Sequence, residues 1–335
     1  MNVFITGGTG LVGRHVIAAL RGRGDGVRAL ARTPAAAAAL EALGATPVRG
    51  DLGDDASLRL GLLGCDGVVH AAASVLAGGS WRAWHEINVR GTERVARCAA
   101  ERGLRVVHLS AVAVYGRSRG GIDRPGDDEG FDLERAPRPR EPYARSKREA
   151  ELALWRVAAE TGLAAAALRP CVIYGEGDRH FSPRIAAMLR RGFVPAIGDG
   201  ANVMTIVYAG NVAAAVTAAL DRPEATGPFN VTNDGRLTVR AFVERFAAGL
   251  GVKPRWVHIP RALAWSITGV WDATLGSLPL PGRSLSLTAA VQFLAGENRY
   301  ASDRAVGMLG WRPPFAADAA AERTGASFRD VASSA

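Results

Sequence analysis

Lysine is almost missing from this 335-residue sequence: of its 41 basic residues only Lys147 and Lys253 are lysines, and the other 39 are arginines. A lysine that survives such a bias is a candidate for a role that needs an ammonium group. The basic residues give a net charge of +9, but they are scattered and form no basic helix, which argues against a nucleic-acid partner. The charge instead favours an anionic small molecule, such as a dinucleotide phosphate.

Cysteine and long apolar runs are also scarce. The three cysteines, Cys65, Cys98 and Cys171, are widely spaced and form no CxxC pair, which argues against a disulfide framework and against a metal site. No uninterrupted apolar run reaches about 18 residues, so no membrane span is expected. The first residues, MNVFITGG, lack the features of a signal peptide, and we therefore expect a cytoplasmic protein.

What the sequence does contain is an alternation of short β-branched segments with longer helical ones. This alternation predicts an α/β fold, a Rossmann-type doubly wound parallel sheet followed by a smaller C-terminal α+β substrate lobe. We expect the dinucleotide-binding domain to cover residues 1–172, with 202–222 returning to it, and the substrate lobe to cover 173–201 and 223–330. The expected strands are 3–6, 27–31, 67–71, 105–110 and 165–170, and the expected helices 11–22, 34–43, 80–103 and 141–161.

A glycine-rich turn separates the first expected strand from the first expected helix. Here Gly7 permits a tight turn, Gly10 lets the backbone approach a pyrophosphate, and Gly13 allows the helix to pack closely on the strand. The helix N-terminus then offers free N–H groups to the phosphates. The turn predicts a dinucleotide site, with a plain strand-turn-helix as the alternative. Its residues are Gly7, Gly8, Thr9, Gly10, Leu11, Val12 and Gly13.

The end of the second expected strand bears on which dinucleotide binds. An acidic residue there would hydrogen-bond the ribose of NAD, but this sequence has Ala31-Arg32-Thr33. The guanidinium of Arg32 can form the charge-assisted contacts that a 2′-phosphate needs. NADP(H) is therefore favoured, while NAD(H) stays open because Arg32 could also be a solvated arginine. Further candidate cofactor contacts are Asp51, Leu52, Ala71, Ala72, Ala73, Pro170 and Val172.

Tyr143 and Lys147 open a long expected helix, where a spacing of four places the phenol and the ammonium on the same face. An adjacent cation stabilises phenolate and would lower the pKa of Tyr143 toward the range of an acid-base catalyst. Lys147 could also hold the nicotinamide ribose hydroxyls. The pair predicts a hydride-transfer site, with a surface helix pair as the alternative.

Together these residues resemble the extended short-chain dehydrogenase/reductase superfamily, the NAD-dependent epimerase/dehydratase family, with features of 3β-hydroxysteroid dehydrogenases and dihydroflavonol-type reductases. The resemblance covers nearly the whole chain. It implies a seven-stranded Rossmann sheet, Asn88 in the proton-relay position and a homodimer formed through two long helices per subunit. The motifs that carry it are TGGTGLVG at 6–13, DL at 51–52, HAAA at 70–73, INVRGT at 87–92, HLSAVAVYG at 108–116, YARSK at 143–147, LRPCVIYGEGD at 168–178 and LGWRPPF at 309–315.

One position departs from the pattern of these families. They usually carry Ser or Thr, which bonds the substrate oxygen, where this sequence has Ala111. Ser110 precedes it as a candidate catalytic residue, but neighbouring side chains on a strand point to opposite faces. Three interpretations stay open: Tyr143 alone polarises the oxygen, a local bulge turns Ser110 into the site, or the protein binds cofactor with weak or no turnover.

Substrate contacts are the least specified part of the sequence. Beside Ala111, we expect Arg179, His180 and Phe181 to face the cleft, since they follow the GEGD turn. The apolar segment 259–282 is either a helix packed on the core or a lid over a hydrophobic substrate. We therefore expect an NADP(H)-dependent oxidoreductase that interconverts a ketone or aldehyde and an alcohol on a sterol-, polyketide- or acyl-like small molecule. A nucleotide-sugar epimerase or dehydratase is the alternative.

Overall fold

The computed structural model describes residues 1–75, 80–116, 133–134, 139, 141–232, 234–274, 291, 293–296 and 300–329. The chain divides into two compact units. The first unit consists of Met1–Cys171, Ala209–Thr232 and Tyr300–Pro314, and the second of Val172–Tyr208, Asn233–Arg299 and Phe315–Ala335.

A seven-stranded sheet forms the centre of the first unit, in the order β10-β6-β5-β4-β1-β2-β3. All its strand pairs are parallel, which confirms the predicted Rossmann-type α/β fold. The strand order reverses between β1 and β4, and ligands of such sheets bind at the carboxyl ends of the strands beside this switch point. The strands are β1 (Asn2–Thr6), β2 (Gly26–Ala31), β3 (Thr46–Arg49), β4 (Gly67–His70), β5 (Arg105–Leu109), β6 (Ala165–Pro170) and β10 (Gly227–Val231).

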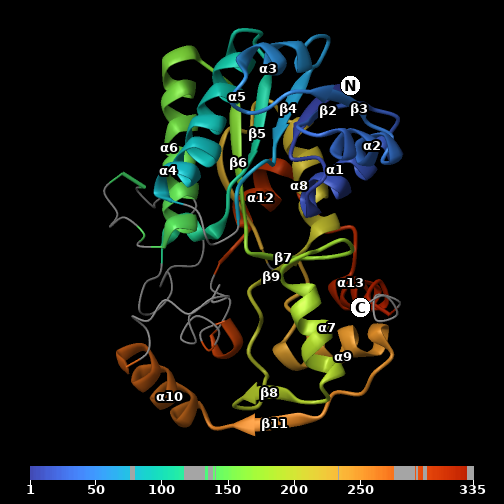
Figure 1. Cartoon of the computed structure of the whole chain (residues 1–335), viewed down its shortest axis with the longest axis vertical. Helices are drawn as coiled ribbons and strands as arrows, with labels where there is room; N and C mark the ends of the chain where they lie inside the picture. Colours follow the sequence, from blue (N-terminus) through green and yellow to red (C-terminus); the bar gives the residue numbers. More distant parts are fainter. Residues whose placement is uncertain are drawn as a thin grey trace. The chain divides into compact units, whose positions relative to one another are not determined.

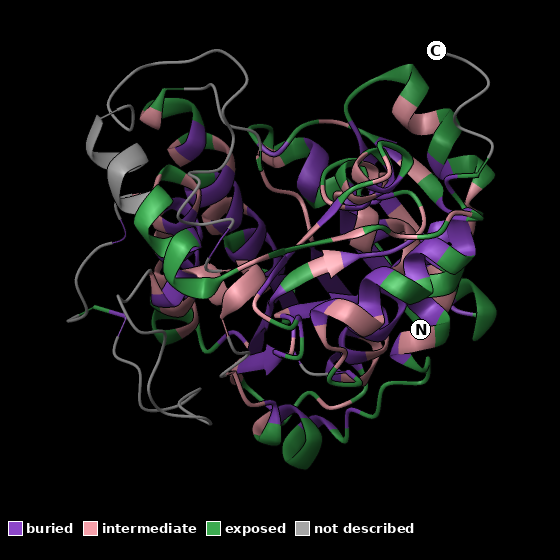
Figure 2. Ribbon diagram, turned by 90° about the horizontal axis from the view of Figure 1, so that it is seen from below, coloured by how far each residue is buried: buried purple, intermediate pink, exposed green. Residues whose placement is uncertain are grey.

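Helices cover both faces of this sheet (Figure 1). On one face α1 packs against α8, and on the other α5 packs against α3 and α6. Buried residues concentrate in the strands and on the inward sides of these helices (Figure 2). The helices are α1 (Leu11–Gly22), α2 (Pro34–Ala42), α3 (Asp55–Gly61), α4 (Trp81–Trp84), α5 (Gly91–Ala100), α6 (Pro142–Thr161), α8 (Ala209–Leu220) and α12 (Asp303–Leu309), together with the π-helical turn η1 (His85–Arg90) and the 3₁₀ turn η2 (Val112–Tyr115).

Helix α6 carries the expected acid-base pair, and its ends follow from the sequence. Pro142 occupies the first turn, where the missing N–H of proline would have no partner in any case. Gly162 ends the helix with φ +73°, a conformation that glycine adopts without strain. Between them Ala150, Leu154 and Val157 recur at helical spacing and are buried, and Leu154 and Val157 share a core cluster with residues of the sheet. The apolar stripe therefore fixes which face of α6 turns inward, and the buried Lys147 lies on that face.

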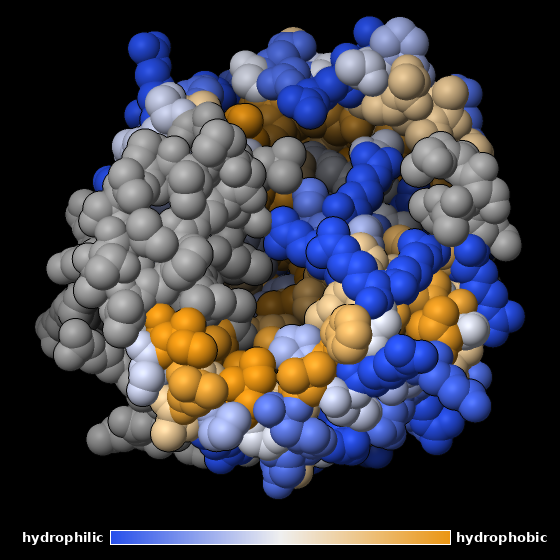
Figure 3. Space-filling view, turned by 60° about the horizontal axis from the view of Figure 1, so that its bottom comes forward, coloured by the Kyte–Doolittle hydropathy of each residue, from blue (hydrophilic) through white to orange (hydrophobic). Residues whose placement is uncertain are grey.

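The second unit contains two small parallel sheets, β11-β8 and β7-β9, and a separate aromatic core. Tyr174, Phe242 and Phe246 are fully buried in that core. On the face shown in Figure 3, hydrophobic side chains gather in patches and a band of hydrophilic side chains runs between them. The elements are β7 (Val172–Tyr174), α7 (Ser182–Arg190), β8 (Val194–Ile197), β9 (Ile206–Tyr208), α9 (Val239–Leu250), β11 (Trp256–Ile259), α10 (Arg261–Thr274) and α13 (Ala317–Ala326).

The apolar segment 259–282 is described only in part, because residues 275–282 lie outside the described residues. Its first turns belong to α10, where Leu263, Trp265 and Ile267 are exposed. Among the described helices, none has both the length and the apolar character of a membrane span. The three cysteines are buried and form no disulfide with one another, and no group of three or more metal-ligating side chains is found in the described part of the chain.

Candidate active site

The glycine turn packs against the chain that leaves β4. Gly7 has φ +77°, and a Cβ there would lie 2.6 Å from the Ala72 nitrogen. A Cβ on Gly13 would lie 2.2 Å from the Gly7 carbonyl oxygen, and the Gly10 N–H donates to that same oxygen at 3.0 Å. No other residue fits Gly7 or Gly13 without moving the backbone. The fold thus brings together two stretches of expected cofactor contacts, Gly7–Gly13 and 71–73.

The N-terminus of α1 is open for an anion. Gly10 is its N-cap and supplies no side-chain hydrogen bond, and the first turn has no acidic residue. Thr9, Leu11 and Val12 are partly exposed around it. Uncapped N–H groups and the positive end of the helix dipole suit a phosphate, and the glycine cradle leaves room for one. These residues fit the pyrophosphate of a dinucleotide.

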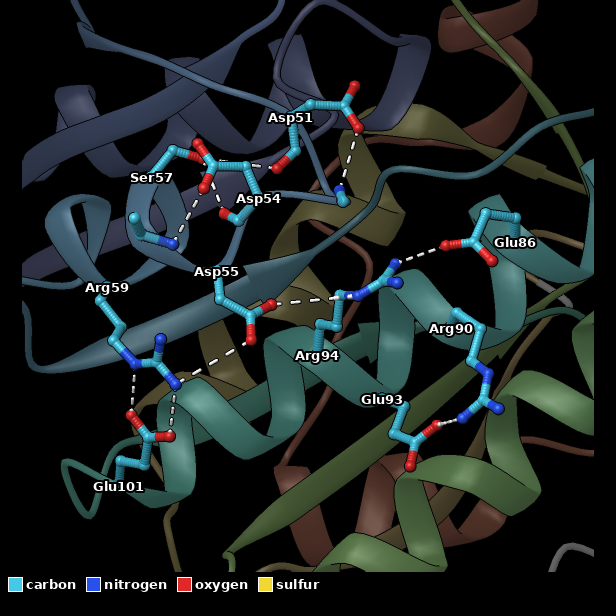
Figure 4. A network of polar contacts seen from close by, with 12 residues as sticks. Asp51, Asp54, Asp55, Ser57, Arg59, Glu86, Arg90, Glu93, Arg94 and Glu101 are labelled. Atoms are coloured by element: carbon cyan, nitrogen blue, oxygen red, sulfur yellow. Dashed lines mark hydrogen bonds and ion pairs between the residues drawn. The ribbon is translucent and has the colours of Figure 1, made fainter.

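Arg32 and Asp51 lie at the adjacent strand ends, where an adenosine ribose is expected. Arg32 follows β2 with 72% of its side chain exposed, and its Nε lies 4.0 Å from an Asp51 carboxylate oxygen. Asp51 also accepts the Gly53 N–H at 2.9 Å (Figure 4), while Leu52 is buried. Since the contact with Asp51 is long and exposed, it restrains Arg32 weakly. Arg32 is therefore available to a ligand phosphate.

Ion pairs on the surface link α3 to the helix that carries Asn88 (Figure 4). Arg94 reaches Glu86 at 2.7 Å and Asp55 at 3.9 Å, and Arg59 bonds Glu101 at 2.8 Å. Exposed pairs of this kind contribute about 0–1 kcal/mol each. These ion pairs form a solvated face of the helix.

The side chain of Asn88 ties the chain after β4 to the first turn of α6. Its Oδ1 accepts the Ser74 N–H at 2.7 Å, and its Nδ2 donates to the Ser74 carbonyl at 3.1 Å and to Ser146 Oγ at 2.8 Å. Ser146 in turn donates to the Tyr143 carbonyl at 2.8 Å. All hydrogen-bonding atoms of the amide are engaged, so this geometry gives the Asn88 side chain a positioning role.

Asn88 lies in a π-helical turn, in which the Gly91 N–H bonds the Glu86 carbonyl five residues earlier. Such turns often accompany functional sites. The Asn88 carbonyl accepts the Thr92 hydroxyl at 2.6 Å, so the main chain of Asn88 is held as well as its side chain. The proton-relay role expected of Asn88 stays a prediction.

Tyr143 and Lys147 lie one turn apart on α6, and the pKa of Tyr143 departs from the expectation. Lys147 is buried, its Nζ donates to the Leu109 carbonyl at 2.7 Å, and burial lowers its pKa to about 8. Burial raises the pKa of Tyr143 to about 12, and the Trp84 ring packs edge-on beside it with centroids 6.1 Å apart. The predicted lowering of the Tyr143 pKa is absent here because desolvation of the phenol dominates.

Ser110 points toward α6, where its Oγ donates to Glu151 Oε2 at 2.5 Å. Its N–H keeps the strand pairing with the Leu168 carbonyl at 2.8 Å. The interpretation in which a bulge turns Ser110 into the site is therefore not supported. Ala111 is buried at the start of η2 and brings no hydroxyl. Among the hydroxyl candidates named from the sequence, Tyr143 is left to polarise a substrate oxygen.

A buried ion pair beside Ser110 was not predicted. Glu151 and Arg169 are almost completely buried, and Arg169 NH2 lies 2.5 Å from Glu151 Oε1. Arg169 NH1 also donates to Tyr115 Oη at 2.8 Å, and the Tyr115 hydroxyl in turn donates to Asn230 Oδ1. The signal for this pair was present: Glu151 stands on the buried face four residues after Lys147, and Arg169 interrupts an apolar strand.

The remaining candidate contacts for cofactor and substrate are divided between the two units. Pro170 is buried at the end of β6, and Val172 is exposed at the start of β7. Arg179 and His180 are exposed in the second unit. Phe181 packs against Phe242 and Phe293 with centroids 5.9 and 5.7 Å apart, so its ring belongs to the second core.

Comparison with known proteins identifies the family of this chain. Residues 3–233 match the model of the NAD dependent epimerase/dehydratase family. A short-chain dehydrogenase/reductase superfamily protein from Agrobacterium tumefaciens with bound NAD superposes with a TM-score of 0.71 at 22% identity, covering 99% of this chain and 98% of that one. At that identity the likeness shows the fold.

Two curated relatives extend the comparison to named activities. The 4-hydroxy-2-methyl-3-oxo-4-farnesyl-3,4-dihydroquinoline-1-oxide ketoreductase of Stigmatella aurantiaca is 30% identical over 312 residues, which cover 93% of this chain and 92% of that protein. The 2-alkyl-3-oxoalkanoate reductase of Stenotrophomonas maltophilia is 33% identical over 263 residues, covering 75% and 76%. This chain therefore belongs to the NAD dependent epimerase/dehydratase family and is an NAD(P)-dependent oxidoreductase of the extended short-chain dehydrogenase/reductase type.

Proposed function

We propose that this enzyme is an NADP(H)-dependent ketone reductase that converts a hydrophobic ketone to an alcohol. The observation that carries the proposal is the placement of Tyr143, a half-buried phenol one helical turn from the buried Lys147, and burial raises the pKa of this phenol to about 12. A phenol that keeps its proton at neutral pH is suited to act as the acid of a reduction. Trp84 packs beside it, so the surroundings of the acid are apolar.

The residues of this chain divide the work as follows. The glycine turn, the N-terminus of α1 and Arg32 would hold the cofactor, which supplies the hydride when bound. The Tyr143 hydroxyl donates its proton to the carbonyl oxygen as the carbon is reduced. Lys147, held by the Leu109 carbonyl, presents an ammonium that favours the phenolate left behind. Asn88 fixes the first turn of α6 through Ser146.

The names of the relatives support a ketone with an apolar substituent. The Stigmatella protein is named for a 3-oxo ring with a farnesyl group, and the Stenotrophomonas protein for a 2-alkyl-3-oxoalkanoate. Both names describe a ketone next to a hydrocarbon chain. We infer the same substrate class for this enzyme, a ketone flanked by an alkyl or prenyl chain.

The substrate class can be tested by following NADPH oxidation with a panel of ketones. We expect turnover of long-chain 2-alkyl-3-oxoalkanoates and of prenylated or alkylated aryl ketones, with kcat/KM rising as the chain lengthens, because each buried methylene contributes about 0.8 kcal/mol. UDP-sugars in the same assay test the alternative function, an epimerase. Interconversion of UDP-sugars by a tightly retained cofactor, without net NADPH consumption, would replace the proposal with an epimerase.

Cofactor choice is tested at Arg32. NADPH should bind the wild type more tightly than NADH, and Arg32→Ala should reduce that preference by roughly 10- to 100-fold, the loss expected for charge-assisted hydrogen bonds to a phosphate. Fluorescence titration of each nucleotide measures both constants. Arg156→Ala removes another exposed arginine as the matched control and should leave the preference unchanged. Equal affinities in the wild type would contradict the assignment.

A further inference from the structure

A chain of hydrogen bonds runs through a buried imidazole beneath the site. His70, the last residue of β4, has its Nδ1 2.6 Å from Thr6 Oγ1 and its Nε2 3.0 Å from Thr92 Oγ1. All three side chains are buried. Thr6 is the last residue of β1, directly before Gly7, and Thr92 lies in the first turn of α5. The imidazole therefore connects the strand end that begins the glycine turn with the helix that follows Asn88.

The direction of each hydrogen bond in this chain is determined. The single hydroxyl proton of Thr92 goes to the Asn88 carbonyl at 2.6 Å, so His70 Nε2 must be the donor to Thr92. Burial lowers the pKa of His70 to about 3, and a neutral imidazole with a proton on Nε2 has none on Nδ1. His70 Nδ1 therefore accepts the Thr6 hydroxyl proton.

The two ends of the chain reach different parts of the site. At one end Thr6 Oγ1 accepts the Ala72 N–H at 3.4 Å, in the segment that packs against Gly7. At the other end the Asn88 main chain is held by Thr92, while the Asn88 side chain holds the first turn of α6. The chain thus spans from the expected pyrophosphate turn to the expected acid.

We propose that His70 is a positioning residue that couples the cofactor turn to the acid-base helix through Thr6 and Thr92. The test of this proposal by kcat rests on the proposed function, whereas its test by NADPH affinity does not. A ligand seated on the glycine turn and a correctly placed Asn88 then stabilise each other, because both require the same arrangement of the imidazole and its two hydroxyl partners.

The proposal is tested by a double-mutant cycle on NADPH affinity. Thr92→Val removes a hydroxyl on α5, not on the glycine turn, yet it should weaken NADPH binding by about threefold or more because the chain is broken. Thr6→Val alone should also weaken NADPH binding. The double variant should lose less NADPH affinity than the product of the two single losses. Thr92→Ser keeps the hydroxyl and should bind NADPH as the wild type does.

A second imidazole gives the matched control. His108 is equally buried and stacks on His70 with centroids 5.2 Å apart, but neither of its ring nitrogens has a hydrogen-bond partner among the described residues. His108→Leu should therefore leave the coupling between Thr6 and Thr92 intact, whereas His70→Leu should abolish it. Circular dichroism confirms that each variant is folded, and Thr92→Ala replaces Thr92→Val if the valine does not fit.

The outcomes separate this proposal from the proposed function. If the ketone panel shows no turnover, the NADPH cycle still decides whether His70 couples the two ends. If turnover is found, Thr92→Val should also lower kcat, because the Asn88 main chain loses its partner. Wild-type NADPH affinity in Thr92→Val, or strictly multiplicative losses in the double variant, would overturn the role of His70.

Discussion

Replacing Tyr143 with phenylalanine should lower kcat by roughly 10²- to 10⁴-fold and leave the Kd for NADPH within about threefold of the wild type. The loss is expected to be large because the site has no hydroxyl at Ala111 and the Ser110 hydroxyl is bonded to Glu151. Phenylalanine keeps the ring that packs on Trp84, so the change removes the proton and little else. Steady-state kinetics on the best ketone, with NADPH titration, gives both quantities.

Tyr174→Phe serves as the matched control for the loss of a phenolic hydroxyl. Its hydroxyl donates to the Ala317 carbonyl at 3.0 Å within the second unit, so kcat should stay within about threefold of the wild type. Activity that survives Tyr143→Phe would remove the proposed acid. A protein that binds NADPH but shows no activity before or after the change would instead be a cofactor-binding protein without turnover.

Glu151→Gln should lower the free energy of unfolding by about 3–5 kcal/mol, the usual result of removing one partner from a buried ion pair. Arg169 would keep its charge in a buried site, with only neutral partners left around it. Since native proteins are stable by about 5–15 kcal/mol, this is a large fraction of the total. Urea and thermal unfolding, followed by circular dichroism, measure the change.

A double variant distinguishes the removal of one partner from the removal of the whole ion pair. Glu151→Leu combined with Arg169→Met removes both charges and should recover a large part of the loss, because no unpaired charge stays buried. Glu160→Gln, on the same helix, removes an exposed carboxylate that bonds Arg97 at 3.0 Å and should cost less than about 1 kcal/mol. Equal destabilisation by the single and double changes would show that packing, not charge, is what matters at this place.

The sequence predicted the sheet well because its signals are local. The expected strand 165–170 coincides with β6, and the expected helix 11–22 with α1, since both are bounded by glycine, proline or a change of periodicity. The segment 300–314 was not predicted to join the first unit. It is held there by contacts distant in sequence, such as the bond from Trp311 Nε1 to the Asn211 carbonyl at 2.9 Å.

The sequence names candidate residues for the site, but it does not predict their burial, their pKa values or their hydrogen-bond partners. Spacing alone places Tyr143 and Lys147 on one face, yet the pKa of each depends on burial by residues from other elements, such as Trp84. The direction of the Ser110 side chain likewise depends on Glu151, which is 41 residues away along the chain. Periodicity predicts which residues turn inward, whereas hydrogen-bond partners follow from the tertiary fold.

The π-helical turn at Asn88 also constrains how the length of this chain can change. A hydrogen bond across five residues means that η1 holds one residue more than a regular helix would over the same rise. Deleting a single residue from 85–90 would restore regular α-helix over nearly the same rise, so the flanking helices would keep their relation while the Asn88 side chain and carbonyl would lose the places that the widened turn gives them. Asn88 could then no longer reach Ser74 and Ser146 while Thr92 faces His70. Insertions and deletions should therefore be tolerated in the surface loops around this helix but not within this turn.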